Sequence, residues 1–236
     1  IIKKKEFYNA ILSFIDSESE SEDEFRTITK FINDQDEESI RETFSLLYAI
    51  GNNHHRTAYF FDRLSLIFKQ LTKKRLPISN TEIYNIYKNN KRLLLLLFEH
   101  KVIIPDESIL SELMKNFDSN QMKQYFYFFS EIKEFLGKRK KKHISYMIEQ
   151  KFKESIESFE SKIKIGENDS PICKLIRNDS IQEFISLINQ TNLSLTSIIK
   201  ADFYESNPFL IENNPSLIEY AFFFGSIQII KYLQNY

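Results

Sequence analysis

The stretch that most constrains the fold lies near the end of the chain, at residues 216–234, and predicts two short helices joined by a turn at Gly225. The second of these helices opens on Ser226. A helix pair with one apolar face on each member cannot bury those faces alone, so it must stack on a neighbour. The apolar residues that recur at helical spacing here are Ile218, Ala221, Phe222, Ile227, Ile229, Ile230 and Leu233.

A related pattern occurs earlier, at residues 170–188, with an offset of 46 residues (216 − 170 = 46). The tripeptide Ser-Ile-Gln starts at residue 180 in the earlier copy and at residue 226 in the later one. Between the copies, residues 189–215 are rich in Asn and Ser, and we expect an elaborated loop with room for one helical turn. The other matched pairs are Ser170 with Ser216, Ile172 with Ile218, Leu175 with Ala221, Ile176 with Phe222, and Asp179 with Gly225.

Residues 166–236 resemble two ankyrin repeats. The usual signature of that family is Thr-Pro-Leu-His-x-Ala-Ala-x-x-Gly-His followed by Ile-Val-x-x-Leu-Leu. The earlier copy keeps the opening of the signature as Ser170-Pro-Ile, and the later copy keeps its second half from Gly225 to Leu233. The resemblance therefore implies two divergent repeats, at residues 170–190 and 216–236.

The two copies depart from the ankyrin signature at several positions. Cys173 and Glu219 replace the histidine that normally ties neighbouring repeats together, and Asp179 replaces the turn glycine. An ankyrin repeat has a period of about 33 residues, so the offset of 46 residues implies about 13 inserted ones. We expect this insertion to stand where a regular repeat has its β-hairpin finger.

The resemblance implies a non-catalytic scaffold that binds another protein. In ankyrin repeats the contact positions lie on the first helix of each pair, facing the concave side. When these contact positions are carried over to this sequence, those of the first copy are polar residues and those of the second copy are aromatic residues. The contact positions are Lys174, Arg177 and Asn178 in the first copy, and Tyr220, Phe223 and Phe224 in the second.

The aromatic residues Phe223 and Phe224 have two interpretations. In the first, the inserted segment or the preceding domain covers both rings, since large exposed apolar patches are uncommon on soluble domains. In the second, the rings anchor a protein partner. Replacing both residues by serine distinguishes the two: loss of folding favours the first, whereas lost binding with retained folding favours the second.

The outer face of the later helix pair is expected to receive a third repeat. A solenoid repeat contacts its neighbours on both sides, so its outer face is normally covered. We expect Ile229 and Leu233 to lie near this contact. On this interpretation the chain is part of a longer repeat array.

The first 164 residues predict a separate all-helical leader domain. Gly (4) and Pro (5) are scarce in the chain, whereas sheet proteins use many such residues in tight turns. Apolar spacing predicts about eight helices in antiparallel pairs, among them continuous helices over residues 120–136 and 138–164. The expected fold is all-α: a helical-hairpin, solenoid-like domain at residues 1–164, then the two ankyrin-type helix pairs at residues 165–236. This order resembles ankyrin-repeat families of unicellular eukaryotes in which a helical domain of unknown function precedes the repeats.

A basic run at residues 138–142 is the sharpest charge feature of a chain whose net charge is −1. The simplest interpretation is an exposed helix start, and the alternatives are a nuclear localisation patch and a nucleic-acid contact. No aromatic residue interleaves the basic ones, which argues against nucleic-acid binding. We expect a cytoplasmic scaffold, with a nuclear or nucleic-acid-associated factor as the alternative. The run comprises Lys138, Arg139, Lys140, Lys141 and Lys142.

The sequence contains no recognisable catalytic or cofactor motif. His54 and His55 are adjacent and point to different sides of a helix, so they make a poor metal pair. The single cysteine, Cys173, is expected to be an inert buried thiol. The longest apolar run, residues 93–98, is too short to cross a membrane. We therefore expect no catalytic residue, metal or cofactor; the rival interpretation, an enzyme such as a helical hydrolase, requires a deep polar pocket.

Overall fold

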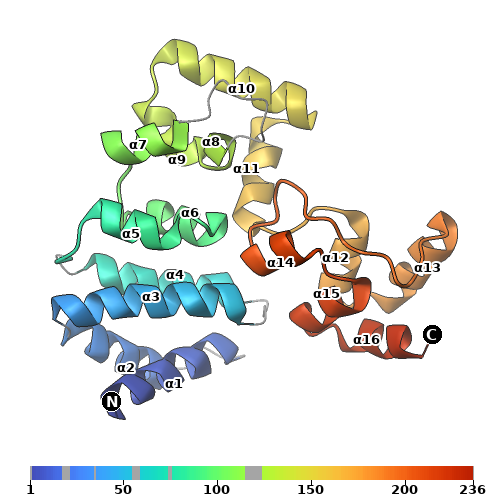
Figure 1. Ribbon diagram of the computed structural model, residues 1–236, viewed down its shortest axis with the longest axis horizontal. Helices are drawn as coiled ribbons and strands as arrows, with labels where there is room; N and C mark the ends of the chain where they lie inside the picture. The colour runs from blue at the N-terminus through green and yellow to red at the C-terminus, as the bar shows by residue number, and fades with distance from the viewer. Residues whose placement is uncertain are drawn as a thin grey trace. The chain divides into compact units, whose positions relative to one another are not determined.

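The computed structural model describes residues 2–17, 22–34, 36–54, 59–73, 76–114 and 124–235. The regular elements in these ranges are helices, with one β-bridge between Ile198 and Ser216 (Figure 1). The prediction of an all-α protein is confirmed. None of the helices within these ranges combines the length and the apolar character that a membrane span requires.

The chain divides into two compact units. The first unit comprises Ile1–Asn89 and Leu93–Glu134, and the second comprises Asn90–Arg92 and Phe135–Tyr236. The boundary expected after residue 164 therefore falls inside the second unit.

The first unit has an aromatic and leucine-rich core. Its helices are α1 (Ile2–Asp16), α2 (Glu22–Asn33), α3 (Glu37–Asn53), α4 (Phe60–Thr72), α5 (Asn80–Tyr87), most of α6 (Lys91–Glu99), α7 (Glu107–Met114), α8 (Gln124–Tyr127) and α9 (Phe129–Ile132). α1 and α2 pack together and both contact α4, while α3 contacts α5 (Figure 1). The buried Tyr87 hydroxyl donates a hydrogen bond to the Phe44 carbonyl oxygen at 2.7 Å. Residues 93–98 are buried along their whole length, as their composition predicts.

Short polar side chains fix where several of these helices begin. The Asp36 carboxylate accepts a hydrogen bond from the Ser39 backbone N–H at 2.9 Å and caps α3. Ser79 and Glu82 form a capping box at the start of α5, as the sequence Ser-Asn-Thr-Glu predicts.

The second unit is organised around aromatic side chains and two short helix pairs. Its helices are α10 (Lys138–Phe152), α11 (Ile156–Ile165), α12 (Pro171–Arg177), α13 (Ile181–Thr191), α14 (Pro208–Asn213), α15 (Leu217–Phe224) and α16 (Ile227–Gln234), and the 3-10 helix η1 (Lys133–Phe135) begins just before it. The Phe152 ring centroid lies 4.7 Å from that of Phe159 and 4.8 Å from that of Phe203. Because Phe203 belongs to the inserted segment, these rings join α10 and α11 to the part of the chain that contains the helix pairs.

Two helices that the apolar spacing predicts as continuous are broken in the structure, so those predictions are wrong. The helix expected over residues 138–164 stops at Lys153, which has a left-handed backbone (φ 55°). Ser155 then starts α11 by accepting a hydrogen bond from the Ser158 N–H. The helix expected over residues 120–136 is interrupted at Phe128, within its described part. Apolar periodicity continues across both breaks, which is why it does not reveal them.

Candidate interaction surface on two stacked helix pairs

The last part of the second unit contains two stacked helix pairs. α12 packs with α13 and α15 packs with α16, while α12 contacts α15 and α13 contacts α16. The pairs share a core in which Cys173, Tyr220 and Ile229 are completely buried. Local sequence sets the helix ends: Pro171 occupies the first turn of α12, and Gly225 ends α15 in the left-handed conformation (φ 67°).

Asp179 connects the first helix pair to the second. It occupies the turn position that Gly225 occupies in the later pair, and it also has a positive φ, of 49°. Its carboxylate accepts hydrogen bonds from the backbone N–H groups of Gln228 and Ile229, both at 3.0 Å. Ser226, the N-cap residue of α16, makes no side-chain capping bond. Asp179 therefore caps α16 from the preceding helix pair.

Replacing Asp179 by alanine is expected to lower the free energy of unfolding by about 1–2 kcal/mol, because two N–H donors of α16 lose their acceptor. Asp179→Asn keeps one acceptor oxygen and tolerates positive φ, so it is expected to retain about half of this stability. Urea unfolding of the full chain, followed by circular dichroism, measures both effects. Glu183→Ala on α13 is the matched control, expected within about 0.5 kcal/mol of the wild type. Equal stability of the Asp179→Ala protein and the wild type would contradict the capping role.

A second connection uses Ser226, which is 1% exposed. Its hydroxyl donates a hydrogen bond to the Ile176 carbonyl oxygen at the end of α12. Cys173 and Glu219 stand where the ankyrin signature has its connecting histidine. The contacts of Ser226 and Asp179 thus join the helix pairs without that histidine.

Two of the expected contact positions, Arg177 and Tyr220, lie inside the junction between the pairs. Arg177 Nε pairs with a Glu167 carboxylate oxygen at 2.7 Å, and Arg177 Nη1 donates to the Tyr220 hydroxyl at 2.9 Å. Burial raises the pKa of the Tyr220 hydroxyl well above its ordinary value. Tyr220 is completely buried, so it does not occupy the exposed position that the resemblance implies; it packs the second pair onto the first.

The other polar contact positions are exposed. Lys174 is about half-exposed and its ammonium group lies 2.6 Å from an Asp169 carboxylate oxygen. Asn178 is exposed at the end of α12. These two side chains, rather than Arg177, are accessible to another molecule.

Phe223 and Phe224 are half-buried and belong to a row of aromatic rings. The Phe209 ring, from α14 of the inserted segment, stacks on Phe223 at 6.3 Å between centroids. Phe224 lies 5.1 Å from Phe223, and the Arg177 guanidinium lies 5.8 Å from the Phe224 ring centroid. The inserted segment thus covers part of Phe223, while Phe209 itself remains 49% exposed. We call Phe209, Phe223 and Phe224 the aromatic row.

The outer face of the second pair differs from the expectation. Ile229 is fully buried and Leu233 is 9% exposed, so neither presents an open apolar face. Phe222 is 55% exposed, although its counterpart in the first pair, Ile176, is completely buried. Ile176 is therefore part of the core that the two pairs share, whereas the equivalent residue of the second pair, Phe222, is open to solvent.

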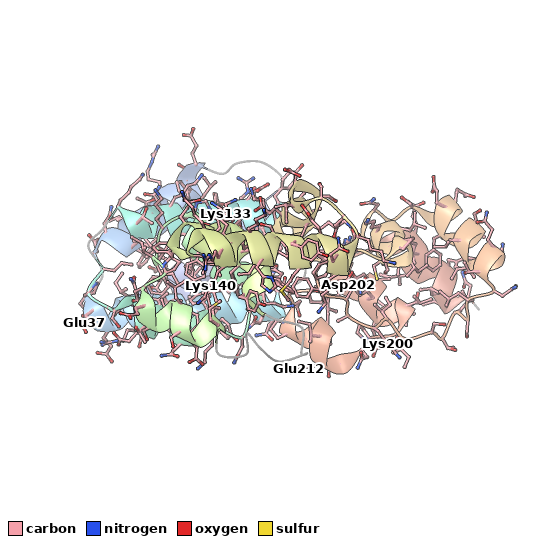
Figure 2. All side chains as sticks on the ribbon, turned by 90° about the horizontal axis from the view of Figure 1, so that it is seen from above. Glu37, Lys133, Lys140, Lys200, Asp202 and Glu212 are labelled. Atoms are coloured by element: carbon pink, nitrogen blue, oxygen red, sulfur yellow. The ribbon has the colours of Figure 1, made fainter. Side chains whose placement is uncertain are left out.

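The inserted segment is a folded structure held by two carboxylates. The Asp202 carboxylate accepts hydrogen bonds from the Asp169 N–H at 2.6 Å and the Tyr204 N–H at 2.9 Å. The Glu205 carboxylate is buried and also accepts backbone hydrogen bonds. Figure 2 shows Asp202 among neighbouring side chains, whereas Lys200 and Glu212 are exposed. The expected loop contains one short helix, α14, in agreement with the room predicted for a helical turn.

A network of charges lies where the chain enters the first helix pair. Lys162 Nζ is 2.6 Å from a Glu154 oxygen and 3.0 Å from an Asp169 oxygen, and the Tyr204 hydroxyl donates to Glu154. Burial alone would raise the pKa of both carboxyl groups, but the hydrogen bonds they accept outweigh it. Hydrogen bonds from Lys162, Tyr204 and Ser158 therefore lower the pKa of Glu154. Hydrogen bonds from Lys174 and Lys162 lower the pKa of Asp169 in the same way.

The stability of the second unit is expected to fall as the pH drops below the ordinary carboxyl pKa values of 4.5 for Glu154 and 3.8 for Asp169. The unfolded chain binds protons in this range while the folded chain resists them, so acid favours unfolding until both folded groups are protonated. Thermal unfolding followed between neutral pH and about pH 3 measures this slope. Glu154→Gln should reduce the slope and the exposed control Glu149→Gln should not; an identical slope in all three proteins would contradict the role of the network.

Neither the thiol nor the basic run forms a chemical centre. Burial raises the pKa of the Cys173 thiol, consistent with the inert thiol predicted. The basic run begins α10, where Figure 2 shows Lys140, and all its members except the half-buried Lys141 are exposed. His55 lies outside the described residues, and the described His, Cys, Asp and Glu side chains form no group of three or more that could hold a metal.

Comparison of the chain with protein-family models, with curated proteins and with solved structures finds no match. The candidate surface is therefore defined by its own geometry. It consists of the aromatic row, contributed by α14 and α15, together with Phe222 on α15 and the exposed Lys174 and Asn178 on the first pair.

Sequence reasoning missed three residues that shape this surface. Phe209 lies in the segment expected to be a loop, although its position one residue after Pro208 in a capped turn is a signal for a helix start. Asp179 stands in the sequence as a departure from the signature, and no sequence motif singles out Glu205. Asp179 acts on residues 49 and 50 positions away, so nothing in its neighbourhood along the chain reveals its role.

Proposed function

We propose that the chain is a non-catalytic protein–protein interaction scaffold of the ankyrin-repeat type, which acts in the cytoplasm. The observation that carries the proposal is a display of aromatic side chains on α14 and α15, beside two helix pairs that share one core. The aromatic row and Phe222 combine exposed ring surface with a backbone fixed by Asp179 and Ser226. Aromatic side chains held in this way are the common anchors of protein interfaces.

The expected contact positions divide into two roles under this proposal. Lys174, Asn178, Phe223 and Phe224 contact the partner, since each has accessible surface. Arg177 packs against the Phe224 ring and so helps to hold it in place. A polar set beside an aromatic set matches the usual anatomy of an interface, in which a polar rim surrounds an apolar centre.

The double substitution Phe209→Ser with Phe222→Ser tests the proposal. Both side chains are about half-exposed, so their loss should leave the helix pairs folded. We expect the immobilised full chain to capture a defined partner from native extract, and the double variant to bind that purified partner at least about tenfold more weakly. Circular dichroism checks that the variant remains folded.

Ile198→Ser is the matched control, because Ile198 is an exposed apolar residue of the same unit outside the aromatic row. It should bind the partner as the wild type does. Two outcomes would overturn the proposal: no protein retained above the background of the matrix, or equal affinity of the double variant and the wild type.

The basic run provides the alternative function, a nuclear or nucleic-acid-associated factor, because four of its five residues are exposed. Retention of the chain on a DNA column that is lost on adding salt, and lost again in the variant Lys140→Glu with Lys142→Glu, would favour it. Elution with neutral proteins at low salt would favour the scaffold.

A further inference from the structure

A groove of about 1000 Å³ lies among α1, α2 and α3 of the first unit. Its apolar lining includes Phe7, Phe31 and Leu46, and the Phe7 and Phe31 ring centroids are 5.3 Å apart. Phe7 is 5% exposed, whereas Tyr8 beside it is 41% exposed. The groove therefore has a packed aromatic base and an accessible apolar edge.

Two helices contribute one face each to this groove. On both, the lining positions follow the spacing i, i+3, i+4, i+7, which is the spacing of a single helix face over two turns. At 1.5 Å per residue, each face is about 10 Å long. The residues are Thr27, Lys30, Phe31 and Asp34 along α2 and its last turn, and Ser39, Glu42, Thr43 and Leu46 along α3.

The charge of the groove is unevenly distributed. Its lining contains four carboxylates and two lysines, an acidic excess of two (4 − 2 = 2). Asp34 and Asp36 lie at the connection between α2 and α3, and Glu42 lies further along α3. Thr27 and Leu46, at the other end of the two faces, are uncharged. Lys30 lies one turn before Asp34, while Lys5 and Glu6 of α1 offset each other in charge. The end at the connection therefore has an excess of acidic side chains, and the other end is uncharged.

We propose that this groove binds a basic amphipathic helix of a protein partner, with the N-terminal end of that helix toward Asp34 and Asp36. A helix laid in a groove places its i, i+3, i+4 and i+7 side chains on the apolar base, and the two host faces have the matching length. The N-terminal end of a helix carries partial positive charge, so together with basic side chains it complements the acidic end. The residues involved all belong to the first unit, so this binding does not depend on the function proposed for the helix pairs.

Fluorescence anisotropy with the full chain and a labelled synthetic helix tests the proposal. The peptide has about 16 residues, enough for partial helicity in water, with leucine at i, i+3, i+4 and i+7 and lysine in its first turn. We expect saturable binding that weakens as salt is added. A peptide with glutamate in place of lysine should bind at least about tenfold more weakly, and one with lysine moved to the last turn about threefold more weakly.

Substitutions in the chain locate the binding site. Asp34→Lys and Leu46→Lys should each weaken binding of the lysine peptide at least about tenfold. The first substitution introduces charge repulsion at the acidic end, and the second removes an apolar contact. Glu149→Lys and Tyr146→Ser, both exposed on α10, are the matched controls and should leave binding unchanged. Circular dichroism of each variant reports whether it is folded.

A measurement on the wild type keeps the test decisive if a groove variant unfolds. Bound peptide should slow amide hydrogen exchange in α2 and α3, and not in α10. Absence of saturable binding up to about 1 mM would overturn the proposal, as would equal affinity for the glutamate peptide. Binding of dodecyltrimethylammonium without binding of the peptide would assign the groove to a small cationic amphiphile. Binding of the chain to anionic vesicles alone would assign the groove to a membrane surface. Either result overturns the proposal that a helix occupies the groove.

Discussion

Replacing Glu205 by alanine is expected to lower the free energy of unfolding of the second unit by about 3–5 kcal/mol. The Glu205 carboxylate is 1% exposed and accepts hydrogen bonds from the N–H groups of Ser206 and Asn207, both at 2.9 Å, and of Asn168 at 3.3 Å. Alanine leaves these buried donors without this acceptor, at a cost of about 1–3 kcal/mol each, reduced where the backbone can relax. Urea unfolding measures the loss, and hydrogen exchange should accelerate most at these three amides.

Two further variants define the origin of the effect. Glu205→Gln keeps one acceptor oxygen, so it should recover part of the stability. Glu212→Ala removes an exposed carboxylate from the same inserted segment and should remain within about 0.5 kcal/mol of the wild type. An Asn168 amide that exchanges at the wild-type rate in the Glu205→Ala protein would show that Glu205 does not connect the inserted segment to the first helix pair.

Arg177→Met is expected to destabilise the second unit by about 2–4 kcal/mol. The Arg177 and Glu167 side chains are 12% and 19% exposed, so methionine leaves a largely buried carboxylate without its ion pair. The Asn168 carbonyl and the Tyr220 hydroxyl also lose the Arg177 donor, at 2.7 Å and 2.9 Å. Methionine keeps most of the aliphatic volume, so the change reports mainly on the polar contacts.

Lys174→Met is the matched control for Arg177→Met, since both residues are cations on α12 at expected contact positions. The Lys174 side chain is 49% exposed, so its pair with Asp169 should contribute no more than about 1 kcal/mol. Similar losses for the two variants would mean that Arg177 is an ordinary surface cation and not a support of the junction.

The sequence predicts the helix pairs well because their signals are local. Ser216 and Glu219 form a capping box, Gly225 has the left-handed conformation that a turn glycine supplies, and Ser226 begins the next helix. Each of these features depends on residues within one or two helical turns. The same holds for the buried leucine run at residues 93–98, whose composition excludes an exposed position.

The candidate surface is less predictable because its determinants lie far apart along the chain. The partner of Ser226 is 50 residues away at Ile176, and Glu205 binds a backbone group 37 residues away at Asn168. Tyr220 illustrates the same difficulty: a signature position suggests an exposed side chain, but the neighbouring pair supplies Arg177 and buries it. No spacing rule within one helix encodes such contacts.

The cap that Asp179 supplies has a consequence for how this part of the chain folds. An isolated helix of eight residues, the length of α16, is unstable in water, and here two of its first N–H groups receive their acceptor from the earlier pair. The later pair therefore owes much of its stability to its contacts with the earlier pair. We expect the two pairs to melt in one cooperative transition, and a peptide covering residues 216–236 alone to show little helical circular dichroism.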